Sequence, residues 1–259
     1  MLHTSAEPAT LTETLLWPAP RVRPTLMVDD VHVWAASLEQ PAATVRVLES
    51  LLSIQELNRA ERFRNERDRR RYVVAHGILR DVLAGYRKAA PRTLRFTVDK
   101  TGKPALSDER GPTALRFNLS HTADMALIAV TLGREIGVDV ECIRPISELD
   151  SIVESHFTAR ERDTLRTMAS TAKPSAFYRC WTRKESYAKA TGEDLSATLG
   201  GFDTMLSSGP ADLSLADPRR ASGWNLHELL PADGYVGAVA IAGPVGRILS
   251  WRWAEGTYQ

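Results

Sequence analysis

A short run near the middle of the chain reads Ile136-Gly137-Val138-Asp139-Val140-Glu141. Its β-branched residues alternate with small or acidic ones, and this period of two predicts a strand whose successive side chains point to opposite faces. Asp139 and Glu141 stand two apart and therefore share a face. Two neighbouring carboxylates can hold a hard cation such as Mg²⁺, which prefers oxygen ligands. A solvated acidic pair at a strand edge has the same pattern, so the pair alone leaves both interpretations open.

Helices and strands are expected in blocks on both sides of this run. Strands are predicted at 31–34, 94–98, 116–120, 224–230, 235–241 and 248–253, between Gly and Pro turns, and at 125–132, which is apolar enough to be a buried strand. Apolar residues at helical spacing predict helices at 45–63, 72–83, 151–157, 159–168 and 175–190. Thr158 and Glu161 have the spacing of a capping box, and Gly192 follows the last helix as a C-terminal stop. Blocks of this kind favour an α+β fold with antiparallel sheets and packed helices over a regular βαβ alternation.

The charge of the chain excludes some classes of protein. The 33 basic and 32 acidic residues sum to +1, whereas proteins that coat nucleic acid or anionic membranes carry a strong basic excess. No run approaches the eighteen apolar residues of a membrane span, and the N-terminus lacks the pattern of a signal peptide. Cys142 and Cys180 have no CxxC spacing and are interpreted as reduced core thiols. We therefore expect a cytoplasmic protein that binds neither nucleic acid nor membrane.

Three further features carry chemistry only in combination. Glu185 and Lys189 lie one turn apart on the predicted helix 175–190, a spacing that is also that of an ordinary exposed ion pair. His121 ends a predicted strand and can donate to a phosphate oxygen, although a lone histidine is more often packed or on the surface. The run 59–71 holds seven arginines and three acids, which fits a solvated helix face or a phosphate clamp. The P-loop, GxGxxG, HExxH and GxSxG motifs are absent, so any phosphate would be bound by side chains.

Four segments in a fixed order resemble the signature of a known family. They are Gly102-Lys103-Pro104, Phe117-Asn118-Leu119-Ser120-His121, Gly137-Val138-Asp139-Val140-Glu141 and Trp181-Thr182-Arg183-Lys184-Glu185-Ser186-Tyr187-Ala188-Lys189. Their order and spacing are similar to those of the 4′-phosphopantetheinyl transferases of the monomeric, surfactin-synthetase-activating (Sfp) type. The resemblance runs from about residue 55 to 205, and more loosely over residues 30 to 255.

The resemblance implies a fold and an activity. The fold would be two similar α/β halves related by a pseudo-twofold axis, with an N-terminal arm over 1–28, a coenzyme A-binding half over 29–135, and a magnesium-binding and catalytic half over 136–259. The activity would be Mg²⁺-dependent transfer of the 4′-phosphopantetheine arm of coenzyme A to a serine of an apo acyl or peptidyl carrier protein. Adenosine 3′,5′-bisphosphate would be released. The enzyme would be a monomer that meets its carrier transiently.

The resemblance also implies roles for individual residues. The magnesium ligands would be Asp139, Glu141 and Glu185. The catalytic groups would be Glu185, Lys189 and His121, with either Glu185 or a water that it orients as the base for the carrier serine. The contacts to coenzyme A would come from Arg59, Arg71, Lys103, Ser120, His121, Lys184 and Lys189, with Arg59 and Arg71 at the 3′-phosphate.

Two features depart from the family pattern. Arg59 stands where relatives commonly carry lysine, and Glu56 stands where another basic residue is common. The residues after Pro145 and the segment 191–196 are candidates for the surface that receives the carrier. Carriers of fatty-acid, polyketide, nonribosomal-peptide and siderophore pathways are all open. Two other functions fit the same acids: a Mg²⁺-dependent phosphohydrolase or nuclease, and a non-catalytic module that binds coenzyme A and regulates another protein.

Overall fold

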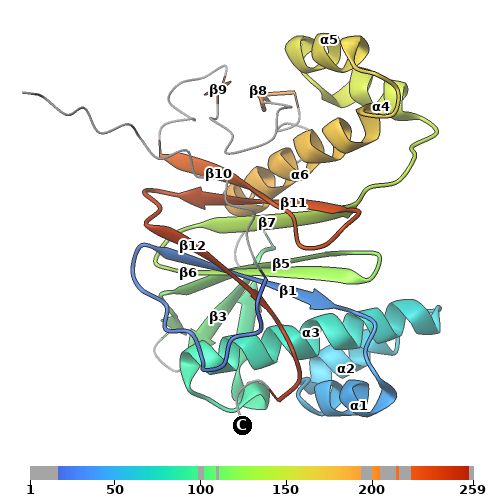
Figure 1. Cartoon of the computed structure of the whole chain (residues 1–259). Helices are drawn as coiled ribbons and strands as arrows, with labels where there is room; N and C mark the ends of the chain where they lie inside the picture. Colours follow the sequence, from blue (N-terminus) through green and yellow to red (C-terminus); the bar gives the residue numbers. More distant parts are fainter. Residues whose placement is uncertain are drawn as a thin grey trace, which may run out of the picture.

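Two sheets pack face to face between two groups of helices (Figure 1). The computed structural model of the chain describes residues 17–98, 102–108, 111–193, 200–204, 214–215 and 223–256. The sequence predictions for 1–16, for the turn residues 99–101 and for 194–196 lie outside these described residues. The predicted α+β class with two halves is confirmed, because each half has a sheet of mostly antiparallel strands with a long helix on its outer face.

The first half contains most of the strands of the larger sheet. Its elements are β1 (Asp30–Ser37), α1 (Ala42–Ser50), α2 (Ile54–Ala60), α3 (Glu66–Arg87), a 3₁₀ turn (Pro91–Thr93), β2 (Arg95–Val98), β3 (Pro104–Asp108), β4 (Gly111–Pro112), β5 (Leu115–Thr122) and β6 (Met125–Leu132). The larger sheet has the order β12-β1-β6-β5, and β2, β3 and β4 form a separate small sheet.

The second half contains the motifs that carry Asp139, Glu141, Glu185 and Lys189. Its elements are β7 (Ile136–Cys142), α4 (Leu149–His156), α5 (Ala159–Thr167), α6 (Lys173–Thr191), β8 (Phe202–Asp203), β9 (Ser214–Leu215), β10 (Trp224–Leu229), β11 (Tyr235–Ala242) and β12 (Arg247–Arg252). The second sheet has the order β10-β11-β7. Every strand predicted from the sequence between residues 31 and 253 overlaps an observed strand.

Alternation along the strands places the core on both faces of each sheet. On β1, Val31 and Val33 pack against β7 and β11, whereas Trp34 on the opposite face packs against α3. On β7, Ile136, Val138 and Val140 face the larger sheet. The intervening positions of β7, which include Asp139 and Glu141, therefore face α6. This is the shared face that the sequence predicted.

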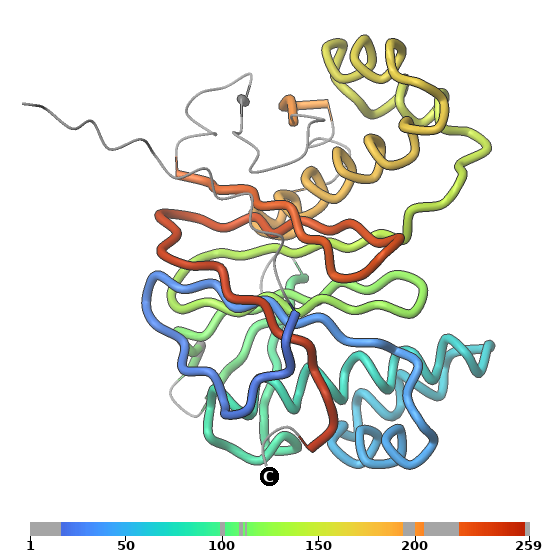
Figure 2. Tube along the Cα trace, in the orientation of Figure 1, coloured from blue at the N-terminus to red at the C-terminus, as the bar shows by residue number. Residues whose placement is uncertain are grey.

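The last strand returns to the first half. Figure 2 shows β1 in blue and β12 in red side by side, and the two strands pair in parallel from Asp30 with Arg247 to Ala35 with Arg252. Parallel neighbours need a long connection rather than a hairpin, and these strands lie at opposite ends of the chain. A boundary between residues 135 and 136 therefore does not separate the two sheets completely, because the larger sheet includes β12 from the second half.

The prediction of a single helix over 45–63 is wrong. The helix is interrupted between α1 and α2, and Ser53 caps the start of α2 with a capping box. The Ser53 side chain accepts a hydrogen bond from the backbone nitrogen of Glu56, and the Glu56 side chain accepts one from the backbone nitrogen of Ser53. The expected box at Thr158 and Glu161 is confirmed at the start of α5, and Gly192 ends α6 in the left-handed conformation. No helix of the described residues is long and apolar enough to cross a membrane.

Candidate active site

The contact between β7 and α6 is unusually close and depends on Gly137. A Cβ atom at this position would lie 2.0 Å from the backbone oxygen of Ser186 and 2.5 Å from the backbone nitrogen of Ala190. Any larger residue would push α6 away from the strand. The absence of a side chain at Gly137 thus lets α6 bring Glu185 and Lys189 beside the acidic face of β7.

Lys189, Asp139 and Ser120 form one polar cluster from three elements. Lys189 Nζ donates to Asp139 Oδ1 at 2.6 Å and to Ser120 Oγ at 3.0 Å, and Ser120 Oγ donates to the same Asp139 oxygen at 2.8 Å. Asp139 is 3% exposed, and its second oxygen, Oδ2, is buried without a hydrogen-bond partner. A buried carboxylate oxygen of this kind is costly unless a ligand completes it.

Side chains of β5 hold β7 in this position. Asn118, Ser120 and Thr122 share one face of β5 because they stand two residues apart. Asn118 Oδ1 accepts from the backbone nitrogen of Val138 at 2.8 Å, and Thr122 Oγ1 donates to Glu141 Oε2 at 3.1 Å. Polar side chains therefore join the two strands across the boundary of the halves.

The three expected carboxylates influence one another. Burial, and after it the negative charge of Asp139, raises the pKa of both Glu141 and Glu185. Burial also raises the pKa of Asp139, although Lys189 and Ser120 oppose that shift through their charge and hydrogen bonds. The negative charge of Asp139 thus disfavours ionisation of Glu141 and Glu185, and a bound cation would offset this repulsion.

The donor set fits a divalent cation, although it is not a closed metal site. Within the described residues, no three His, Cys, Asp or Glu side chains are grouped closely enough to hold a metal ion by themselves. Mg²⁺ is usually held by one or two carboxylates together with substrate phosphate and water. The unpartnered Oδ2 of Asp139 and the mutual pKa shifts of the acids fit such an incomplete, oxygen-rich site.

A cavity of about 850 Å³ opens beside the cluster. Four of the expected residues line it: Arg59, Ser120, His121 and Lys189. Its walls come from α2, α3, the β2–β3 hairpin, β5 and α6. Apolar side chains of the first half form part of its surface, and Phe96 and Phe117 meet there edge to face at 5.6 Å. The cavity combines an apolar wall with cations, as a ligand that carries phosphates and a flat base would require.

The protonated form of His121 is disfavoured beside these cations. Burial, followed by the positive charges of Lys189 and Arg71, lowers the pKa of His121 from its ordinary value. Arg71 itself donates to Asp124 Oδ1 at 2.6 Å, in the turn between β5 and β6. Arg71 is not among the residues that line the cavity. The structure therefore places Arg71 near His121 but pairs it with an acid.

Two lysines that were expected to contact coenzyme A do not line the cavity. Lys184 is 0% exposed and lies 3.1 Å from Glu161 Oε2 inside the second half, and it also donates to the backbone oxygen of Phe202 at 2.6 Å. Lys103 donates to Glu135 and to the backbone oxygen of Ile136. Neither residue lines the cavity. Lys184 is thus turned away from the cluster, because neighbouring positions of a helix point in different directions.

Several residues of the site were missed. Asn118 and Thr122 could have been found from the period of two that also selects Ser120. Tyr72 and His76 line the cavity from α3 and stack at a centroid distance of 3.9 Å. Their spacing of four matched a helix face, but nothing in the sequence distinguished a cavity wall from core. Asp124 is a turn residue whose pairing with Arg71 depends on the fold.

Comparison with protein families agrees with this arrangement. A model of the N-terminal part of 4′-phosphopantetheinyl transferases matches residues 33–132, and the model of the 4′-phosphopantetheinyl transferase superfamily matches residues 135–240. The chain is 41% identical over 220 residues to the 4′-phosphopantetheinyl transferase HetI of Nostoc sp., covering 85% of this chain and 90% of HetI. This chain belongs to the 4′-phosphopantetheinyl transferase superfamily. The family resemblance of the sequence is confirmed.

Other relatives of this transferase are more distant. A putative 4′-phosphopantetheinyl transferase of Synechocystis sp. is 30% identical over 175 residues, which cover 67% of this chain and 69% of the relative. The 4′-phosphopantetheinyl transferase Sfp of Bacillus subtilis is 29% identical over 196 residues, with coverage of 75% and 84%. The family models together match both halves of the chain.

Proposed function

We propose that this transferase moves the 4′-phosphopantetheine arm of coenzyme A to a serine hydroxyl of an apo carrier protein and releases adenosine 3′,5′-bisphosphate. The observation that carries the proposal is the cluster of Lys189, Ser120 and Asp139 at the edge of a cavity of about 850 Å³. A cation and a buried acid with one oxygen unpartnered there suit a diphosphate and its counter-ion.

Coenzyme A would occupy the cavity with its phosphates toward the cluster. Lys189 would then contact the pyrophosphate, where its charge offsets that of the phosphate oxygens. His121, whose pKa is lowered, would offer one N–H donor as a neutral ring. Arg59 lies over the Tyr72 ring at 6.0 Å and lines the cavity, so we assign the 3′-phosphate to Arg59 in preference to Arg71, which is paired with Asp124.

The carboxylates would hold Mg²⁺ through Asp139, Glu141 and Glu185. When bound, the metal would neutralise charge on the diphosphate as the phosphoryl group is transferred. The residues themselves orient the reactants: Thr122 fixes Glu141, and Ser120 and Lys189 fix the first oxygen of Asp139. Alignment and charge neutralisation are the main tasks in phosphoryl transfer.

Glu185 is our candidate for the group that accepts the serine proton. A carboxylate that ligates a metal ion through one oxygen can accept a proton through the other. The carrier serine would lose its proton to Glu185, attack the β-phosphorus of coenzyme A, and break the bond to the adenosine 3′,5′-bisphosphate oxygen. Lys189 would stabilise the charge that develops on that leaving oxygen.

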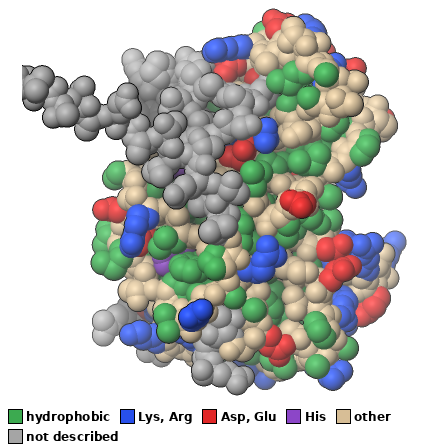
Figure 3. Space-filling model, viewed as in Figure 1, with side chains coloured by type: hydrophobic (Ala, Val, Ile, Leu, Met, Phe, Trp, Pro, Cys, Tyr) green, Lys and Arg blue, Asp and Glu red, His purple; other side chains and the backbone are tan. Residues whose placement is uncertain are grey.

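The proposal includes a cytoplasmic monomer that meets its carrier transiently. Both cysteines, Cys142 and Cys180, are free thiols, as expected for a reducing compartment. On the face shown in Figure 3, basic and acidic side chains of the described residues are interspersed, which agrees with the net charge of +1 and argues against a nucleic-acid-coating surface.

The test is mass spectrometry of apo carrier proteins incubated with this protein, coenzyme A and Mg²⁺. We expect a phosphopantetheine adduct on one serine of at least one carrier in a panel drawn from fatty-acid, polyketide and nonribosomal-peptide systems. The same carriers with that serine changed to alanine are the control. If no member of the panel gained the adduct, the proposal would be wrong. Release of inorganic phosphate would instead indicate a phosphohydrolase.

A further inference from the structure

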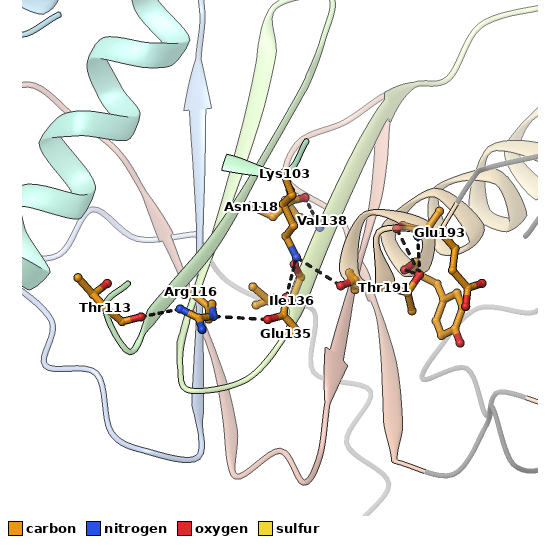
Figure 4. Close-up of polar contacts among 12 residues, drawn as sticks. Lys103, Thr113, Arg116, Asn118, Glu135, Ile136, Val138, Thr191 and Glu193 are labelled. Atoms are coloured by element: carbon orange, nitrogen blue, oxygen red, sulfur yellow. Dashed lines mark hydrogen bonds and ion pairs between the residues drawn. The ribbon is translucent and has the colours of Figure 1, made fainter. Parts of the chain in front are cut away.

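Lys103 lies where the β2–β3 hairpin meets the boundary between the two halves (Figure 4). Its Nζ donates to the backbone oxygen of Ile136 at 2.8 Å and to Glu135 Oε2 at 3.1 Å, and it lies 3.4 Å from the backbone oxygen of Ala190. The Lys103 side chain is 12% exposed. One ammonium group thus joins the hairpin, the start of β7 and the last turn of α6.

These contacts suit the chemistry of an ammonium group. Lysine has three donors and no acceptor, and the three oxygens supply a place for each. The last carbonyls of a helix have no partner within the helix and carry partial negative charge. Ala190 is in the last turn of α6, which ends at Thr191. Because the group is mostly shielded from water, salt screens these contacts less than it screens an exposed ion pair.

Glu135 extends the connection to β5. Its Oε1 lies 3.4 Å from Arg116 Nε, and the Arg116 guanidinium also donates to the backbone oxygen of Thr113 at 2.5 Å (Figure 4). Glu135 precedes the first residue of β7 in the link between the two halves. A single carboxylate therefore connects the hairpin, through Lys103, with the strand that carries Ser120 and His121.

The two walls that Lys103 joins are walls of the cavity. On the hairpin side, Pro104 and residues 96–98 line it, and on the α6 side Lys189 lines it. We propose that Lys103 and Glu135 are positioning residues that clamp the hairpin to the end of α6 and so fix the spacing of the cavity walls for coenzyme A. This inference rests on the proposed function for the identity of the ligand.

A direct contact from Lys103 to the nucleotide is the competing role, and the two roles give different results. In the clamp, Lys103 and Glu135 act together, so removal of either loosens the hairpin and weakens binding. In direct contact, Glu135 competes with the nucleotide for Lys103. Removal of Glu135 would then leave binding unchanged or strengthen it.

The first test measures coenzyme A binding and transfer in Lys103→Met, Glu135→Ala and the double variant. We expect each single variant to raise the Kd and KM for coenzyme A by about five- to tenfold. The double variant should be no weaker than Lys103→Met, and kcat at saturating coenzyme A should stay within about twofold of wild type, because the reacting groups are untouched. Arg95→Gln is the matched control, since it removes one charge from an exposed position of the same hairpin.

The second test needs no ligand. Hydrogen exchange of the free protein should be faster over residues 102–108 and 186–192 in Lys103→Met and Glu135→Ala than in Arg95→Gln. Unchanged exchange, or a Glu135→Ala variant that binds coenzyme A as tightly as wild type, would overturn the clamp. If the wild type failed to bind coenzyme A, the proposed function would fail, and the exchange rates would still decide the clamp.

Discussion

At the scale of single residues, the site depends on acids held where water would normally solvate them. Asp139 is almost fully buried, with one oxygen shared by Lys189 and Ser120 and the other unpartnered. Glu185 lies beside it with a raised pKa. A buried carboxylate oxygen without a partner is destabilising unless a ligand completes it, and we therefore expect a ligand at Asp139 Oδ2.

Asp139→Asn should abolish transfer while the protein stays folded. The amide keeps the size of the side chain but loses the charge that Lys189 and a bound cation need. We expect the transfer rate to fall by at least about 100-fold, as when an electrostatic group of an active site is removed. Transfer kinetics measured together with the thermal midpoint check this. A rate equal to that of wild type would remove Asp139 from the mechanism.

Glu185→Gln should lower kcat without weakening coenzyme A binding to the same extent. The amide cannot accept the serine proton, and we expect a loss of about 100-fold or more. Glu39→Gln is the control, because it makes the same change at an exposed position between β1 and α1, away from the cluster and the cavity. Steady-state kinetics with a carrier protein measure both. If kcat fell equally in both variants, the loss would come from the change in net charge and not from the position of Glu185.

Lys184 has a structural role that the sequence did not reveal. Its partner Glu161 is 2% exposed and also accepts from the backbone nitrogen of Thr204 at 2.7 Å. Lys184→Met should therefore leave a buried carboxylate unpaired and lower the free energy of unfolding by about 3–5 kcal/mol. Urea unfolding measures this loss. Lys184→Met with Glu161→Gln should recover part of it, and a stable single variant would contradict the pairing.

At the scale of elements, β7 and α6 form the functional unit because Gly137 permits their close approach. Gly137→Ala should lower the free energy of unfolding by about 3 kcal/mol or more and abolish transfer, since the new Cβ would meet helix backbone that cannot move aside. Gly200→Ala is the control, because a Cβ there would meet no atom of the described residues within 4 Å. Chemical denaturation and transfer assays compare the two. Wild-type behaviour of Gly137→Ala would show that α6 can shift freely.

Most elements were predictable because their patterns are local. The apolar run at 125–132 and the period of two at 136–141 match the observed strands closely, and the helix over 175–190 ends at the expected Gly192. The break at Ser53 was missed although Ser53 and Glu56 have the spacing of a capping box, because the apolar periodicity continues across it. At this position the apolar periodicity and the capping box gave opposite predictions, and the helix starts at the capping box.

The partners of charged side chains were not predictable in the same way. Lys103 and Lys184 stand in motifs that suggest phosphate contacts, yet their acceptors, Glu135 and Glu161, are far from them in sequence. Only the fold determines which acid reaches which lysine. Family motifs therefore located the site, whereas the distribution of its charges required the structure.

At the scale of the whole molecule, two buried histidines connect stability with pH. Burial lowers the pKa of His32 and of His76 to about 4, from 6.5. Between these values the unfolded chain binds more protons than the folded chain, so the free energy of unfolding falls as the pH falls from about 6.5 to 4. We expect a loss of about 1–2 kcal/mol for each histidine between pH 7 and pH 5.

Urea unfolding at a series of pH values measures this dependence. The His32→Gln variant should show a shallower fall below pH 6.5 than wild type, because the contribution of His32 is lost while those of His76, His121 and His227 remain. His32 accepts from or donates to the Tyr86 hydroxyl at 2.7 Å, so the variant should also be less stable at pH 7. A pH profile identical in slope to that of wild type would contradict a neutral, buried His32.

The central claim is that the cavity and the carboxylates of β7 and α6 together transfer phosphopantetheine. The most direct measurement counts both products of one reaction: holo carrier by intact mass and adenosine 3′,5′-bisphosphate by chromatography, with wild type and Asp139→Asn in parallel. The account predicts equal amounts of the two products from wild type and neither from the variant. Adenosine 3′,5′-bisphosphate formed without holo carrier, or equal transfer by Asp139→Asn, would contradict it.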